Sequence, residues 1–197
     1  PETFGILNAI QMINQLNKYG AFGFNTIVGR EVPFLEGRDA HVEANNVKNT
    51  AYSAEFILAI TMLLIGLSAS MAISTISIKV AVILASIGLF LAKLAKMHRT
   101  ESIVEKKFLD FAKINIYIEI VMTIIILLTI RYWGMHTILA TTAFGSALAI
   151  LLFRRRLKYR FKYSIQTKEL IRQIKIGIPL VFGTLSYGAY RYSERII

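Results

Sequence analysis

The chain has 197 residues, of which 55% are hydrophobic and 18% are charged, with a formal net charge of +11 and no cysteine. Soluble domains are about 45–50% apolar, so the composition points towards a membrane. The lack of cysteine excludes disulfides, thiolate metal sites and cysteine nucleophiles. The basic residues lie in the connections between apolar segments, which argues against a nucleic acid as the reason for the charge.

Hydropathy divides the chain into apolar segments. They are expected at residues 5–28, 54–74, 76–95, 114–133 and 135–153, and a sixth begins at residue 174. Two stretches, 56–78 and 132–153, carry no formal charge and can each cross about 30 Å of hydrocarbon. In the short third segment, Lys79 and Lys93 are expected to snorkel to the two interfaces. The prediction is an all-α polytopic membrane protein with five complete transmembrane helices and the start of a sixth.

The first segment carries a polar stripe. Helical spacing places on one face Asn8, Gln11, Gln15, Lys18 and Asn25. A lysine at mid-span costs about 2.5–3.5 kcal/mol on insertion scales, so this face should meet protein or water. Lys18 is then a cation in an aqueous cavity, the partner of Glu55 or Glu119 in a structural ion pair, or a lysine that snorkels to the lipid surface.

The connections alternate in basic charge. Lys and Arg number three in 29–50, one in 75–79, six in 93–113, one in 131–136 and nine in 154–175. By the positive-inside rule, connections 29–50, 93–113 and 154–175 are cytoplasmic and Pro1 lies on the outer side. The cluster that begins at Arg154 either orients the protein and touches anionic lipid or binds substrate. Residues 105–113 are expected to form an interfacial amphipathic helix that leads into the fourth span.

The last segment carries a second polar stripe. Its members are Thr184, Tyr187, Arg191, Glu194 and Arg195. Arg191 and Glu194 either pair with each other or face a cavity. Two cation-bearing stripes on different helices suggest one shared cavity for a bulky anionic ligand, with amides for hydroxyl groups and tyrosines for sugar faces.

Enzyme signatures are missing from the sequence. No HExxH, G-x-S-x-G or Walker motif occurs, and His41, His98 and His136 are isolated. We therefore expect no catalysis, no metal and no cofactor.

Three stretches of the chain resemble a known family. They are PETFG (1–5), YGAFGFNTIVGREVP (19–33) and ELIRQIKIGIPLVFGTLSYGAYRYSERII (169–197). They resemble the polysaccharide-export flippases, which are Wzx-type O-antigen and repeat-unit transporters of the multidrug/oligosaccharidyl-lipid/polysaccharide superfamily. The similarity runs over essentially the whole chain, although where the family often has Asp-Arg this chain has Glu194-Arg195.

The resemblance implies an organisation and a substrate. Residues 1–168 would be part of the N-terminal lobe of a MATE-like transporter, without its first span, and residues 169–197 would begin the second lobe. The sequence would thus be a piece of a longer protein. Its function would be to flip polyprenyl-pyrophosphate-linked oligosaccharide across the cytoplasmic membrane by alternating access. Its partners would be this substrate, membrane lipids and the polysaccharide polymerase machinery, and no nucleic acid.

The resemblance also suggests roles for single residues. Lys18 would be a cavity cation for pyrophosphate or acidic sugar, and Arg30 would be either a further cavity cation or an interfacial anchor beside Pro33. The full set of expected cavity residues is Gln11, Gln15, Lys18, Asn25, Arg30, Tyr187, Arg191 and Arg195.

Three other functions compete with this interpretation. A cation-coupled multidrug exporter should have an essential intramembrane acid, for which only Glu55 and Glu119 are available, both near an interface. A membrane glycan polymerase or ligase would have a large outer loop, whereas both outer turns here are short. A scaffold would leave the polar stripes unexplained.

Overall fold

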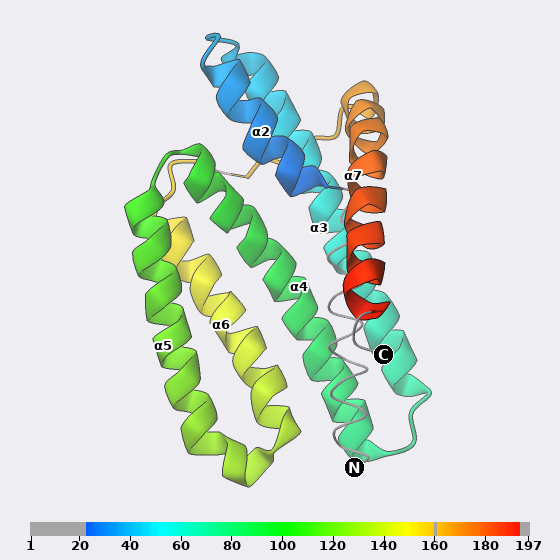
Figure 1. Cartoon of the computed structure of the whole chain (residues 1–197). Coiled ribbons are helices and arrows are strands. Elements are labelled where there is room, and N and C mark those ends of the chain that lie inside the picture. Colours follow the sequence, from blue (N-terminus) through cyan, green and yellow to red (C-terminus); the bar gives the residue numbers. More distant parts are fainter. Residues whose placement is uncertain (1–22, 160, 194–197) are drawn as a thin grey trace. The chain divides into compact units, whose positions relative to one another are not determined.

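The protein is all-helical over the residues that the computed structural model describes, which are 23–159 and 161–193, without the side chains of 180–181 and 184–193. No strand occurs in these ranges. The helices, in chain order, are α2 (Phe24–Glu36), α3 (His41–Met71), α4 (Ile76–Val104), α5 (Phe108–Trp133), α6 (Met135–Arg156) and α7 (Thr167–Ser193) (Figure 1).

Four of these helices, α3 to α6, are long and apolar enough to cross a membrane. The prediction of an all-α polytopic membrane protein is therefore confirmed. The count of five complete spans is not confirmed, because most of the expected first span, 5–28, lies outside the described residues.

The spanning helices are longer than their apolar cores. α3 begins at His41 instead of residue 54, and α4 continues to Val104 instead of ending at 95. The first turns of α3 are helical because Ala44, Val47 and Ala51, spaced three and four apart, are buried on one face although the intervening residues are polar. In α4, Lys93 is only 8% exposed, so it does not reach the surface as the snorkelling prediction required.

The chain divides into two compact units. The described residues of unit 1 lie within Phe56–Arg160, and those of unit 2 lie within Ile13–Glu55 and Phe161–Ile197. α3 contributes its C-terminal part to unit 1 and its N-terminal part to unit 2.

Unit 1 has an apolar interior between antiparallel helices. Ala95 of α4, Ile118 of α5 and Phe153 of α6 form one buried cluster, and the rings of Phe111 and Phe153 lie 6.2 Å apart. A second cluster joins Ala81 of α4 to Leu139 of α6. In a membrane such helices associate through van der Waals packing of their side chains, because lipid is as apolar as the side chains themselves.

Small residues let the helices of unit 1 approach closely. A side chain at Gly66 of α3 would overlap Ser86 of α4, and one at Gly145 of α6 would overlap Met122 of α5. Gly134 joins α5 to α6 with φ of 51° and ψ of −125°, a conformation that residues with a Cβ rarely adopt. Glycine is thus required where helices touch and where the chain reverses.

The two ends of unit 1 differ in charge. At one end, Ser77 at the start of α4 lies 3.2 Å from His136 at the start of α6. At the other end, the α4–α5 turn contacts the end of α6, because Glu105 accepts hydrogen bonds from the backbone of Lys158 and Tyr159. Two of the basic connections, 93–113 and 154–175, therefore contact each other at one end of this unit. Residues 108–113, expected at an interface, are the first turns of α5.

Unit 2 is built from α2, the first half of α3, residues 161–166 and α7. α2 contacts α7, and a short turn joins α2 to α3, with the Ala40 amide donating to the Leu35 carbonyl. The backbone of residues 161–166 is held by α3, because Ser53 Oγ accepts from the Ser164 amide at 3.0 Å and Thr50 Oγ1 from the Gln166 amide at 3.4 Å.

Candidate functional site

An arginine of α7 links two acids in unit 2. The Arg172 guanidinium donates to both carboxylate oxygens of Glu31 on α2, at 3.1 and 2.5 Å, and it also bonds to Glu169 one turn earlier on α7, at 2.9 and 2.7 Å. Two-pronged contacts of this kind are stronger and better oriented than single ones. Arg172 therefore fixes the contact between α2 and the beginning of α7.

The ion pairs shift the protonation equilibria at this contact. Burial opposes ionisation of Glu169, but hydrogen bonds from Arg172 and Gln173 and the charge of Arg172 outweigh it, so the pKa of Glu169 lies below its ordinary value. Hydrogen bonds to Glu169 and Glu31 raise the pKa of Arg172. Glu169 and Arg172 are thus charged at neutral pH, and two acids share one cation.

Gln173 supports the same cluster from inside the unit. Its side chain is fully buried, and its amide nitrogen donates to the Glu169 carboxylate at 2.8 Å and to the Val47 carbonyl of α3 at 3.2 Å. The amide oxygen has no hydrogen-bond partner among the described atoms. Gln173 therefore couples the Glu169–Arg172 pair to α3.

Two adjoining pockets open on this part of unit 2. The larger, of about 450 Å³, has one cation in its lining, Arg172, among the residues Glu31, Phe34, Leu35, Glu43, Asn46, Val47, Gln166, Glu169 and Arg172. The smaller, of about 330 Å³, is lined by Ile27, Arg30, Glu31, Phe34 and Ile176. Glu31 and Phe34 line both pockets. The lining of the larger pocket is acidic, whereas the smaller pocket has one arginine beside an apolar wall.

Arg30 is a cation without a counter-charge. It is exposed at the smaller pocket, and no hydrogen bond or ion pair involves it within the described ranges. The carboxylate next to it in sequence, Glu31, is engaged by Arg172. The guanidinium of Arg30 is therefore available to an anion.

A buried carboxylate lies deeper in unit 2. Glu55 of α3 is 1% exposed and accepts a hydrogen bond of 2.7 Å from the amide of Asn25 on α2, which is itself 7% exposed. Glu119, the other acid considered as a partner for Lys18, is exposed on α5. Glu55 and Glu119, which were predicted as equivalent partners for Lys18, therefore have different surroundings.

The predicted cavity residues are only partly visible. Arg30 lies at a pocket and Asn25 is paired with Glu55, so these two are not brought together. Tyr187 and Arg191 lie on α7, but their side chains are among those not described. Gln11, Gln15, Lys18 and Arg195 lie outside the described residues.

The cluster around Arg172 was not predicted from the sequence. Its members on α7 are Glu169, Arg172 and Gln173, and the spacing of three and four in ELIRQ was a signal that they share a face. The contact with Glu31 joins residues 141 apart in sequence, and no local pattern predicts it.

The arrangement has the features of a polytopic helical membrane protein with a charged site at the ends of its helices. No group of acids and histidines suited to a metal ion occurs in the part of the chain that the structure describes. Comparison with protein-family models, with curated proteins and with solved structures gave no match.

Proposed function

We propose that this protein flips polyprenyl-pyrophosphate-linked oligosaccharide across the cytoplasmic membrane. The observation that supports it best is the smaller pocket, where the guanidinium of Arg30, which has no ion pair among the described residues, adjoins the apolar side chains of Ile27, Phe34 and Ile176. Such a substrate has an anionic pyrophosphate attached directly to a hydrocarbon chain. An arginine matches the first part by two-pronged hydrogen bonding, and the apolar wall matches the second.

The acid beside Arg30 does not oppose this binding. Glu31 would repel a pyrophosphate if its charge were free, but both of its oxygens accept hydrogen bonds from Arg172. Arg30 is then the group in the lining of the smaller pocket that attracts an anion, against the partly compensated charge of Glu31. On this proposal, Lys18, Gln11, Gln15, Tyr187, Arg191 and Arg195 line the cavity through which the sugar passes.

The orientation follows from the charge distribution. Connections 29–50, 93–113 and 154–175 would be cytoplasmic. Arg30 would then lie near the leaflet in which lipid-linked oligosaccharides are made, so that it meets the substrate before translocation.

The test is the leaflet in which lipid-linked oligosaccharide is found in cells depleted of the intact protein. We expect it to accumulate on the cytoplasmic side, with loss of surface polysaccharide. Arg30→Gln should then restore little export at normal membrane abundance. Lys168→Gln is the matched control, because Lys168 is exposed in the first turn of α7 and lines neither pocket. Normal translocation in depleted cells would contradict the function, and full restoration by Arg30→Gln would remove Arg30 from the site.

A cation-coupled multidrug exporter is the second candidate, and one observation favours it. Glu55 is a buried carboxylate of a helix long and apolar enough to cross a membrane, and it has an amide partner; exporters use buried carboxylates for ion coupling. Under this alternative, Glu55→Gln abolishes drug efflux while surface polysaccharide stays normal.

A further inference from the structure

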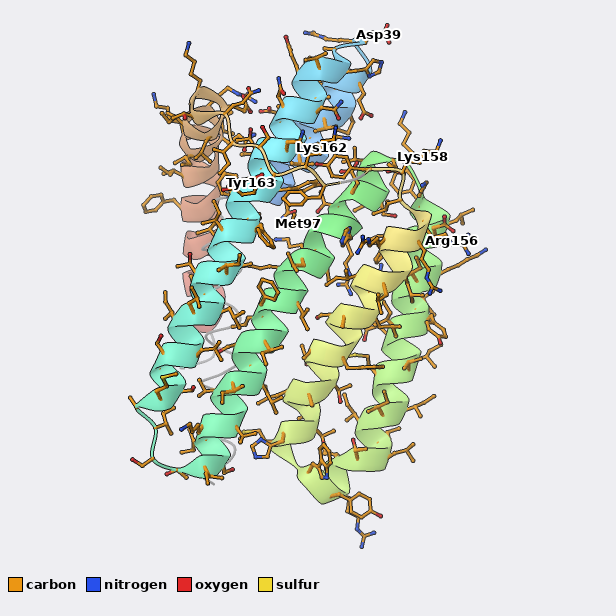
Figure 2. The ribbon with its side chains drawn as sticks, turned by 180° about the vertical axis from the view of Figure 1, so that it is seen from behind. Asp39, Met97, Arg156, Lys158, Lys162 and Tyr163 are labelled. Carbon is orange, nitrogen blue, oxygen red and sulfur yellow. The ribbon has the colours of Figure 1, made fainter. Side chains whose placement is uncertain are left out.

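Five exposed cations lie together at one end of unit 1. They come from the α4–α5 turn and from the end of α6, and we call them the basic rim: Lys106, Arg154, Arg155, Arg156 and Lys158. Figure 2 shows Arg156 and Lys158 extending from the end of α6. Among the described residues, no hydrogen bond or ion pair engages the side chain of any of the five.

The backbone beneath the basic rim is braced. The Glu105 carboxylate accepts hydrogen bonds from the amides of Lys158 and Tyr159, at 3.0 and 2.9 Å. Lys107 bonds to the same carboxylate at 2.6 Å and also donates to the carbonyl of Arg156. These contacts tie the α4–α5 turn to the last turn of α6, so the rim side chains are presented from a fixed backbone.

The same contacts engage the negative charge of Glu105. Burial raises the pKa of Glu105. Hydrogen bonds from Lys107, Tyr159 and Lys158 and the charge of Lys107 lower it by more, so the pKa lies below its ordinary value. Glu105 is therefore ionised, but Lys107 and two backbone amides already engage it. Asp110, in the first turn of α5, forms no ion pair with the rim within the described ranges. Among the described residues, no acid forms an ion pair with a rim side chain, so the rim carries an excess of positive charge.

Apolar side chains flank the basic rim. Phe108 and Leu109, directly after the α4–α5 turn, are 58% and 77% exposed, and Leu151, one turn before Arg155, is 59% exposed. Cations next to exposed apolar side chains at the ends of spanning helices fit the boundary between hydrocarbon and headgroups. An acidic protein segment would match the charge but would leave these apolar side chains in water.

We propose that the basic rim is a binding site for the headgroups of anionic phospholipids, in which its arginines and lysines bind phosphate groups while Phe108, Leu109 and Leu151 contact the acyl chains. This site is separate from the proposed substrate pocket and does not depend on the flippase function. Each rim cation near an anionic surface contributes about fivefold to affinity.

The test compares two double variants of the intact protein in nanodiscs. Arg155→Gln with Lys158→Gln removes two charges from the basic rim and leaves the Glu105 contacts intact, because those use backbone amides. Lys79→Gln with Arg131→Gln removes two charges from the opposite end of the same unit. The measurement is retention of phosphatidylglycerol against phosphatidylcholine by native mass spectrometry, at several salt concentrations.

We expect the rim variant to lose about tenfold or more of its preference for phosphatidylglycerol, and the control variant to keep the preference. The preference of the wild-type protein should fall as salt rises. Equal loss in both variants would show that any cation attracts this lipid and would overturn the site. A wild-type protein without the preference would overturn the proposal and leave the rim for another anionic partner. Because nanodiscs expose both faces, a change of topology in cells does not affect the result.

Discussion

The two units of the protein differ in the contacts that join their helices. Unit 1 packs its helices through apolar side chains and small residues, as at Ala95, Phe153 and the contact of Gly66 with Ser86, although Lys93 and Glu101 are also buried in it. Unit 2 places polar and charged groups inside, as at the Asn25–Glu55 pair and at the buried Gln173. Both of the pockets described above open on unit 2.

The two kinds of contact should respond differently to substitution. Close packing of apolar helices has few alternatives, because each contact depends on shape. Ion pairs and hydrogen bonds between helices can be exchanged for contacts with a ligand at a smaller net cost. We therefore expect substitutions at the closely packed positions of unit 1 to cost more stability than substitutions at the hydrogen-bonded contacts of unit 2. Variants in the two units should differ in how much stability they lose and in how many helices show faster hydrogen exchange.

The largest effect is expected for Gly66→Val in unit 1. A Cβ at this position would overlap both the Cβ and the hydroxyl of Ser86, so α3 and α4 must separate. Overpacking of this kind costs about 3 kcal/mol. The measurement is the SDS concentration at which the protein unfolds in mixed micelles. Gly29→Val is the control, because nothing lies within 4 Å of a Cβ there, and it keeps the midpoint nearer to that of the wild type.

A compensating variant sharpens this test. Gly66→Ala with Ser86→Gly moves the small residue from one helix to the other and should recover most of the stability that Gly66→Ala alone loses. Without recovery, the contact between these two residues would not be the reason for the glycine.

The next effect is expected for Glu55→Ala in unit 2. This change leaves the buried amide of Asn25 without its acceptor, at a cost of about 2 kcal/mol. Glu55→Gln keeps an acceptor and should cost less. Glu119→Ala, at an exposed acid, should change the free energy of unfolding by no more than about 0.5 kcal/mol. Equal effects at Glu55 and Glu119 would erase the contrast between the buried and the exposed acid.

Hydropathy predicted the interior of unit 1 well. The spans 76–95, 114–133 and 135–153 all lie within helices α4, α5 and α6, because a long apolar run has no stable state in a membrane other than a helix. Hydropathy predicted the ends of α3 and α4 less well. The first turns of α3 are polar in sequence, and they are helical through the burial of Val47 and its neighbours, which only tertiary structure provides.

The site in unit 2 was harder to predict. Arg30 was named through the family resemblance, as either a cavity cation or an interfacial anchor, and it lines the smaller pocket without deciding between the two. Arg172 was counted only as a basic residue of a connection, although it makes the two-pronged contact with Glu31. A pairing between residues so distant in sequence depends on how the helices pack, and composition and spacing carry no information about that.

A smaller and local effect is expected for Arg172→Met. The side chain of Arg172 is 44% exposed, so losing its ion pairs should cost about 1 kcal/mol after solvent screening. The first turns of α7 should exchange amide hydrogens faster, while α4 to α6 keep their protection. Lys168→Met is the control. Faster exchange throughout the chain would contradict the local role of this contact.

The same contact predicts a pH dependence. Folding lowers the pKa of Glu169 from its ordinary value of 4.5, so the carboxylate stabilises the folded state above that pH. This contribution is lost as the pH falls through the lower, folded value. Protection of the first turns of α7 should therefore fall on acidification below about pH 4.5, and Arg172→Met should reduce the pH dependence. A dependence of unchanged size in Arg172→Met would point to another titrating group.

The smallest effect is expected for Ser53→Ala, and it tests whether unit 2 also holds the segment that joins α6 to α7. Ser53 Oγ accepts from the Ser164 amide at 3.0 Å, and no other side-chain contact fixes that amide among the described residues. Its loss should cost about 0.5–1 kcal/mol and speed hydrogen exchange at Ser164. Ser68→Ala, at an exposed serine of the same helix in unit 1, should change neither quantity. If both variants leave exchange at Ser164 unchanged, water satisfies that amide as well as the hydroxyl does, and the segment is held by its neighbours instead.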